Sequence, residues 1–235
     1  MMGADRVRKS LAAASNTMGV AVFAKAPAAG LAKTRLAPAL GLQGAARLQR
    51  FLTLQALATA GAAALGPVSL WCAPDPSHRF FRALRLRCGL ACYEQQGATL
   101  GERMAEAFGR CLCAQPVLLI GSDCPTLTAN HLRTAAAALQ SADAALYPAV
   151  DGGYVLLGLR RLHAELFRGI PWGTSLVMHE TRARLAQLGW TWWEGKALHD
   201  LDTVADLAHL PKDFRSALPR SLQSVVSATG PFDGS

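Results

Sequence analysis

The sequence has no long apolar run: none of its stretches approaches the ~20 apolar residues that a bilayer-spanning helix needs. We therefore expect no integral membrane segment. Charged residues make up only 17% of the 235 residues and hydrophobic residues 51%, which excludes a disordered chain and is enough for a sizeable core. The length fits one domain, and no internal repeat is visible.

The sequence also lacks paired cysteine motifs. Its six cysteines include no C-x-x-C pair, and no histidine cluster completes a zinc site. We interpret them as mostly buried thiols in a reducing compartment, which predicts a cytoplasmic location. Cys124 lies beside Asp123, but no histidine nearby in sequence would activate it as a nucleophile.

Two common nucleotide-binding fingerprints are absent from the loop that follows the first expected strand. Gly30 is three residues from Lys33, whereas a P-loop has glycine next to lysine, and there is no G-x-G-x-x-G. The same loop does carry Lys25, Lys33 and Arg35, and three cations at a strand-to-helix exit suit a polyphosphate. The alternative is a flexible loop with solvated charges.

The formal net charge of +8 raises the question of nucleic-acid binding. The basic residues are dispersed, however, and no Lys/Arg block with interleaved aromatic residues occurs. We therefore expect an anionic small ligand, steered by the positive field, and no nucleic acid.

Strand-like and helix-like stretches alternate along the chain. Strands are expected at 19–24, 68–72, 90–95, 117–120, 144–150, 154–159 and 190–193. Helices are expected at 43–62, 77–87, 101–113, 126–139 and 174–188, with a last helix opened by the capping-box-like Thr203-Val-Ala-Asp206. This alternation predicts an α/β fold with a mostly parallel central sheet flanked by helices. We expect residues 1–17 to be a flexible leader, 18–215 a single domain and 216–235 a flexible tail.

The chain is organised around residues 117–125, Val-Leu-Leu-Ile-Gly-Ser-Asp-Cys-Pro. Asp123 follows a short apolar run typical of a buried strand, so it should lie at the carboxyl end of the sheet, where ligands bind. A carboxylate there can hold a divalent cation, although Asp123 is also a suitable helix cap. Asp200 and Asp202, two residues apart, would point the same way in extended backbone, and either could complete the cation site. Alternatively, Asp202 or Thr203 caps the final helix.

Residues 151–154, Asp-Gly-Gly-Tyr, lie between two expected strands. The glycines allow a sharp turn and close backbone approach. Asp151 could bind a sugar hydroxyl or act as general base, and Tyr154 could stack on a substrate ring. A plain hairpin turn is the alternative.

Five motifs together resemble the bacterial DUF2064 family. They are Phe23-Ala-Lys-Ala-Pro…Gly30…Lys33-Thr-Arg-Leu36, Leu100-Gly-Glu-Arg-Met104, Gly121-Ser-Asp-Cys-Pro125, Pro148-Ala-Val-Asp-Gly-Gly-Tyr154 and Asp200-Leu-Asp-Thr203. That family is grouped with GT-A-fold glycosyltransferases and is similar to MobA-like and phospholactate guanylyltransferase-like nucleotidyltransferases. The resemblance implies a three-layer α/β/α sandwich, the nucleotide-diphospho-sugar transferase-like fold, with a nucleotide bound at its N-terminal half.

The resemblance also implies roles for residues. It implies that Mg²⁺ or Mn²⁺ is held by Asp123 and Asp202, with Asp200 as the reserve choice. It implies nucleotide binding by Ala24, Lys25, Pro27, Gly30, Lys33, Arg35, Ser122 and Asp123. It places Gly152, Gly153, Tyr154 and Trp172 on the acceptor side. The chain departs from the glycine-rich MobA loop by having only Gly30. Glu102 and Arg103 either line the base-binding side or, as we favour, form the first turn of a helix.

These observations predict a metal-dependent glycosyltransferase that uses a sugar nucleotide and an unknown small-molecule acceptor. Its catalytic residues would be Lys25, Lys33, Arg35 and Asp151. One alternative is a nucleotidyltransferase that uses a nucleoside triphosphate and releases pyrophosphate. The other is a non-catalytic nucleotide-binding module.

Overall fold

The computed structural model describes residues 18–113 and 115–228, and this part of the chain forms a seven-stranded sheet of order β3-β2-β1-β4-β6-β5-β7. The strands are β1 Gly19–Lys25, β2 Val68–Ala73, β3 Ala91–Glu94, β4 Val117–Gly121, β5 Ala144–Pro148, β6 Tyr154–Leu159 and β7 Trp192–Glu194. Among these described strands, only β6 runs antiparallel to its neighbours. The predicted α/β fold with a mostly parallel sheet is therefore confirmed.

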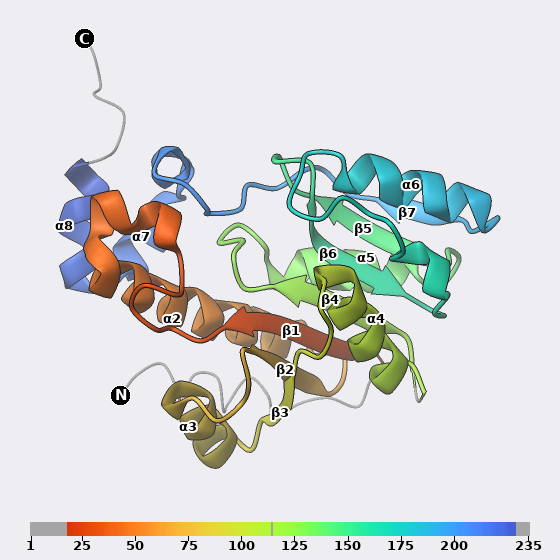
Figure 1. Cartoon of the computed structure of the whole chain (residues 1–235), viewed down its shortest axis with the longest axis horizontal. Coiled ribbons are helices and arrows are strands. Elements are labelled where there is room, and N and C mark those ends of the chain that lie inside the picture. The colour runs from red at the N-terminus through yellow and green to blue at the C-terminus, as the bar shows by residue number, and fades with distance from the viewer. Residues whose placement is uncertain (1–17, 114, 229–235) are drawn as a thin grey trace, which may run out of the picture.

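Both faces of the sheet are covered by helices, as expected for a parallel sheet whose strands are apolar on both sides. The helices are α2 Ala37–Ala63, α3 Arg79–Cys88, α4 Leu100–Cys111, α5 Ala129–Ala138 and α6 Val177–Gln187. Val20 and Val22 of β1 pack in a cluster with residues of α2, α3 and α5, whereas Ala21 and Phe23 pack with α4 and α6. Figure 1 shows α4 crossing in front of the sheet and α2 running behind it. The predicted three-layer α/β/α sandwich is confirmed.

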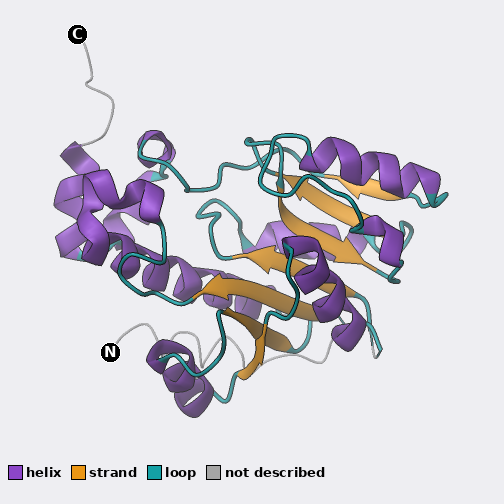
Figure 2. Ribbon diagram, viewed as in Figure 1, coloured by secondary structure: helices purple, strands orange, loops and turns teal. Residues whose placement is uncertain are grey.

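A third apolar cluster joins the start of α2 to the C-terminal part of the chain. Leu48 and Leu52 of α2 pack there with Phe214, Leu222 and Val226. The C-terminal elements are the 3-10 helix η3 Ala205–His209, α7 Lys212–Ala217 and α8 Arg220–Ala228. Figure 2 shows this group of purple helices beside the beginning of α2, away from the strands.

The predicted flexible tail is therefore wrong for residues 216–228. Leu222 and Val226 are four residues apart, so they share one face of α8, and both are buried. The serine-rich composition concealed this short apolar stripe. The predicted leader at 1–17 and the last residues, 229–235, lie outside the described residues.

The predicted capping box at Thr203 is present in part. The Asp206 carboxylate accepts hydrogen bonds from the backbone N–H groups of Thr203 (2.6 Å) and Asp202 (3.0 Å). It opens the five-residue 3-10 helix rather than an α-helix, and α7 begins only after Pro211. Across residues 18–113 and 115–228, no helix is long and apolar enough to cross a bilayer.

Candidate functional site

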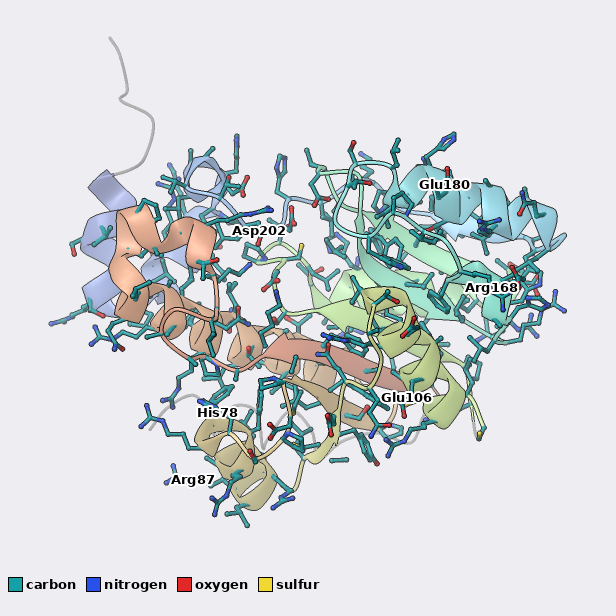
Figure 3. All side chains as sticks on the ribbon, viewed as in Figure 1. His78, Arg87, Glu106, Arg168, Glu180 and Asp202 are labelled. Atoms are coloured by element: carbon teal, nitrogen blue, oxygen red, sulfur yellow. The ribbon has the colours of Figure 1, made fainter. Side chains whose placement is uncertain are left out.

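A cavity of about 310 Å³ opens at the carboxyl ends of β1 and β4. This is the edge of an α/β sheet at which ligands bind, and the volume is typical of a small-molecule site. The lining comes from the end of β1, Gln95 after β3, Leu100 at the start of α4, the turn after β4, the hairpin between β5 and β6, the loop before α6, and the loop that carries Asp200. Figure 3 labels Asp202 between the C-terminal helices and these loops.

Asp123 follows β4 directly and is held by its neighbours. Its Oδ1 atom accepts a hydrogen bond from the Ser122 hydroxyl (3.3 Å) and lies 3.1 Å from Lys33 Nζ. Ser122 is fixed in turn because its hydroxyl accepts a hydrogen bond from buried Gln49 (3.1 Å). Oδ2 of Asp123 has no partner among the described residues. The carboxylate is therefore oriented through one oxygen while the other stays available to a ligand.

Lys33 lies beneath the site rather than in it. Its side chain is 2% exposed, and Nζ contacts Asp123 Oδ1, Asp202 Oδ1 (3.3 Å) and the Leu201 carbonyl oxygen, to which it donates a hydrogen bond. An ammonium group has three N–H bonds, so these contacts use all of them. Lys33 therefore connects the loop after β1 (residues 26–33, the first loop) to the turn after β4 and to the loop between β7 and η3 (residues 195–204, the 200-loop). The group is buried, fully partnered and outside the cavity lining, so the structure shows no N–H of Lys33 directed at a ligand, and its contact with phosphate stays a prediction.

The Asp202 carboxylate forms ion pairs with Lys33 and Arg35. Oδ1 faces Lys33, and Oδ2 lies 3.2 Å from Arg35, whose side chain is 72% exposed. Asp202 does not line the cavity, whereas Asp200 does. The two carboxylates predicted to hold a metal, Asp123 and Asp202, are thus brought together, but around an ammonium group. Asp200, the reserve choice, is the one that faces the cavity.

Asp200 lies in an environment that disfavours its charge. Its pKa is raised from 3.8 to about 6, first by burial and next by the charge of Asp151, with smaller contributions from Asp202 and Asp206. A buried carboxylate that faces another carboxylate gains stability when a cation approaches. Asp200 and Asp151 therefore form, with Asp123, an acidic side of the cavity.

This acidic side suits a cation that arrives with phosphate better than a resident ion. No cluster of three or more His, Cys, Asp or Glu side chains within the described residues is arranged to hold a metal by itself. Mg²⁺ commonly binds proteins through one or two carboxylates together with substrate phosphates. The free Oδ2 of Asp123 and the carboxylate of Asp200 fit that coordination.

Lys25 is the one cation that lines the cavity among the residues that the structure describes. It ends β1 and is exposed, and Ala24 beside it lines the cavity as well. The other predicted nucleotide-binding residues of the loop, Pro27, Gly30 and Arg35, lie outside the cavity lining. Gly30 has φ of +80°, so its role in the structure is to make a turn that other residues rarely adopt.

Residues 151–153 form the predicted Asp-Gly turn, and Asp151 lines the cavity. Asp151 Oδ1 accepts a hydrogen bond from the Gly153 backbone N–H (2.8 Å). A Cβ atom on Gly152 would lie 2.3 Å from the Ser175 carbonyl oxygen, and its φ is +93°. The Met178 N–H donates to the Gly152 carbonyl (2.8 Å). The hairpin is therefore locked against the start of α6.

Tyr154 and Trp172 form one wall of the cavity. Their rings meet edge to face at 6.4 Å, and the Tyr154 hydroxyl donates to Met104 Sδ (3.7 Å) rather than facing the cavity. Burial raises the pKa of Tyr154, so the phenol is neutral. Trp172 lies over Gly101, where a Cβ atom would be 2.7 Å from the indole ring. A glycine at position 101 is therefore required for Trp172 to pack, which explains part of the Leu100–Met104 motif.

Glu102 and Arg103 form the first turn of α4, as favoured. Glu102 Oε2 accepts a hydrogen bond from the Ala98 N–H (2.7 Å), while the Thr99 hydroxyl accepts from the Glu102 N–H (3.2 Å). Arg103 donates to the Gly97 carbonyl (2.9 Å). These contacts hold the loop ahead of α4 and leave neither residue in the cavity lining.

Sequence reasoning missed Gln95 as a site residue. Its side-chain amide donates to the Trp71 carbonyl (2.8 Å) and the Ala24 carbonyl (3.5 Å), and the residue lines the cavity. A polar residue immediately after a strand was the only available signal. Cys124 also lines the cavity, and burial raises the pKa of its thiol, so the structure gives no reason to revive it as a nucleophile.

Comparisons with known proteins agree with this architecture. A crystal structure from Desulfovibrio desulfuricans G20, described as a "putative nucleotide-diphospho-sugar transferase", superposes with a TM-score of 0.83 at 28% identity, covering 92% of this chain and 99% of that one. A cytidylyltransferase from Leptospira borgpetersenii superposes with a TM-score of 0.52 at 12% identity, covering 91% of this chain and 93% of that one. A CMP:2-keto-3-deoxy-manno-octonic acid synthetase complexed with CTP gives 0.50 at 13% identity, covering 82% and 95%.

The two weaker likenesses show a shared fold. No curated protein matches the chain. The family model described as an uncharacterized protein conserved in bacteria (DUF2064) matches residues 54–174, just over half of the chain. This segment includes Asp123, Asp151 and Trp172, and with that match the chain belongs to the DUF2064 family.

Proposed function

We propose that the protein is a divalent-cation-dependent glycosyltransferase that uses a sugar nucleotide as donor and a small molecule as acceptor. The observation that carries this proposal is the cavity at the carboxyl ends of the strands, which Lys25 lines together with Asp123 and Asp200. The description of the Desulfovibrio protein as a "putative nucleotide-diphospho-sugar transferase" supports it.

The charge balance of the cavity supports the requirement for Mg²⁺ or Mn²⁺. Three carboxylates and one lysine line it among the described residues, so the lining itself is negative. At an effective dielectric constant of about 20, two like charges ~4 Å apart repel by roughly 4 kcal/mol. A diphosphate would enter this lining readily only together with a cation. When bound between Asp123, Asp200 and the diphosphate, that cation would neutralise the leaving group.

The chain's own residues then have separate tasks. Lys25 binds a phosphate oxygen as a point charge. Lys33 and Arg35 hold Asp202 and the 200-loop, and Lys33 orients Asp123. Oδ1 of Asp151 is engaged by the Gly153 N–H within the turn. Oδ2 is left to bind the acceptor hydroxyl and to accept its proton. The six cysteines are thiols, the state that a reducing compartment maintains, and we propose a cytoplasmic location accordingly.

A thermal-shift panel of sugar nucleotides and nucleoside triphosphates, each with and without Mn²⁺, tests the proposal. A ligand that binds the folded state raises the melting temperature by mass action. We expect a sugar nucleotide to stabilise the protein only with Mn²⁺. The Asp123→Asn variant should lose that cation dependence, and Asp213→Asn, which removes the same charge at the surface of α7, should retain it. Cation-independent binding, or binding unaltered in Asp123→Asn, would contradict the assignment.

Nucleotidyl transfer differs in its leaving group. A nucleoside triphosphate carries more negative charge than a sugar diphosphate, so the negative lining disfavours it. Incubating the protein with each triphosphate and a phosphosugar pool, then assaying pyrophosphate, measures that reaction directly. We expect no pyrophosphate, and its release would replace the proposal by a nucleotidyltransferase. A non-catalytic module would bind the sugar nucleotide yet consume none of it over long incubation, and Asp151→Asn would then change nothing.

A further inference from the structure

We infer that the acceptor of this transferase is an amphiphile, in which one hydroxyl reacts near Asp151 and the remainder is an apolar chain or ring. This inference rests on the proposed function. Its basis is an apolar wall on one side of the cavity, formed by Phe23, Leu100, Tyr154, Trp172 and Val177.

The apolar wall is where one layer of the core opens into the cavity. Phe23, Tyr154 and Trp172 belong to the cluster that packs between the sheet and helices α4 and α6, which cover the same face in Figure 1. The charged residues Lys25 and Asp200 come instead from the end of β1 and the 200-loop. The cavity is therefore divided into a charged side and an apolar side, and a single ligand that fills it needs both characters.

Two side-chain hydroxyls on the apolar side are already engaged. The Tyr154 hydroxyl donates to Met104 Sδ. The Thr174 hydroxyl donates to the Pro171 carbonyl (2.8 Å) and accepts from the Leu176 N–H (3.3 Å). A sugar acceptor would bring several hydroxyls to this wall, and neither of these two hydroxyls is free to compensate them for lost hydration. Asp151 can serve one hydroxyl, which leaves an apolar remainder as the best fit.

Exposed leucine and valine side chains extend the wall beyond the cavity. Leu100, Val150 and Leu176 are 45%, 56% and 53% exposed. Leu100 lines the cavity, Val150 lies between the lining residues Ala149 and Asp151, and Leu176 precedes the lining residue Val177. The hairpin and the start of α6 that carry Val150 and Leu176 are in direct contact through Gly152 and Ser175. Apolar residues gathered at the mouth of a cavity mark a binding surface, whereas single exposed ones such as Leu86 need no such explanation.

The test is a homologous series of n-alkyl β-D-glucopyranosides, from methyl to octyl, titrated calorimetrically into the full chain below their micelle-forming concentrations. The headgroup is the same throughout the series, so differences in Kd measure only the contribution of the alkyl chain. We expect the methyl compound not to bind measurably and the Kd to fall by roughly fourfold for each added methylene from hexyl to octyl. A Kd that does not depend on chain length would overturn the inference.

Variants separate the apolar wall from general detergent binding. Leu100→Ser and Leu176→Ser should each weaken octyl glucoside binding several-fold, while Leu86→Ser, at an exposed leucine of α3, should leave it unchanged. Equal losses in all three variants would assign the binding to scattered surface residues and reject the wall. All three sites are exposed, so folding is retained, which a melting curve checks.

The failure of this inference can be told apart from failure of the proposed function. The same samples are assayed for Mn²⁺-dependent stabilisation by sugar nucleotides. Sugar-nucleotide binding without any chain-length effect would remove the amphiphilic acceptor and keep the transferase. Chain-length-dependent binding with no nucleotide effect would remove the transferase, and with it the identification of the wall ligand as an acceptor.

Discussion

Replacing Lys33 by methionine tests the link between stability and cation binding in this site. Methionine retains an unbranched apolar stem but removes the ammonium group. The change leaves the Leu201 carbonyl oxygen without its donor and leaves Asp123 and Asp202 facing each other without the charge between them. We expect a less stable protein that binds divalent cations more tightly.

The expected loss of stability follows from the exposure of each partner. The two carboxylates are 44% and 45% exposed, so solvent screens them and each lost ion pair is worth only ~0–1 kcal/mol. The lost hydrogen bond to the Leu201 carbonyl adds roughly 1–2 kcal/mol. The total, about 2–3 kcal/mol, corresponds to a melting temperature lower by roughly 5–10 °C for a domain of this size.

The expected gain in cation affinity has the opposite sign. Lys33 is paired with Asp123 and would repel a divalent ion held by Asp123 and Asp200. At ~5 Å and the dielectric constant of water this repulsion is worth roughly 1–2 kcal/mol, or about tenfold in affinity. Free Mn²⁺ measured by electron paramagnetic resonance, without nucleotide, gives the affinity directly. Lys212→Met, at an exposed lysine of α7, is the matched control. An unchanged melting temperature, or Mn²⁺ affinity that falls in Lys33→Met, would refute the reasoning.

Three further predictions concern other parts of the fold. Gly152→Ala should cost roughly 2–4 kcal/mol of stability, because its Cβ atom would lie 2.3 Å from a carbonyl oxygen of the loop before α6. Gly173 has a similar positive φ, but a Cβ atom there would meet no other atom within 4 Å, so Gly173→Ala should cost less. Denaturant unfolding measures both free energies. Asp200 has its pKa raised to about 6, so its contribution is favourable below pH ~4 and is lost as the pH rises through 6. Asp200→Asn should therefore raise the free energy of unfolding by about 1 kcal/mol at pH 8, after discounting for solvent screening, and should not raise it at pH 3.5. Equal gains at both pH values would show that the ionisation of Asp200 is not the cause. Leu222→Ala should cost roughly 2–4 kcal/mol of stability, since this side chain is buried against α2. The control Ser224→Ala, at an exposed position, should not change the melting curve. An unchanged melting curve for Leu222→Ala would mean that α8 does not stabilise the domain.

The fold was predictable because the evidence for it is repeated along the chain. The apolar run 117–120 is buried on both faces, as its lack of alternation indicated. Thr128 caps α5 and forms a capping box with His131, as expected for a threonine before an apolar helix. Each such signal is local, and many of them agree, so an error in one boundary leaves the topology intact.

The site was less predictable because it depends on where long side chains end. Lys25, Lys33 and Arg35 are equivalent cations in the sequence, yet only Lys25 lines the cavity and Lys33 is buried. Asp200 and Asp202 were expected to point the same way in extended backbone. The segment that carries them is irregular rather than a strand, so the alternation does not hold and the two carboxylates have different partners.

The chain as a whole is positively charged, whereas the lining of its cavity is negatively charged, and this difference affects which ligands can bind. The chain carries a formal charge of +8, so its field attracts anions from a distance. The cavity, with three carboxylates against Lys25, repels the same anions at short range. A nucleotide that binds together with a divalent cation avoids the short-range cost, and a free nucleotide does not. Under the proposed function, selectivity for the complexed form would require no dedicated metal cage, and Lys33, buried between Asp123 and Asp202, would hold Asp123 in place before the complex binds.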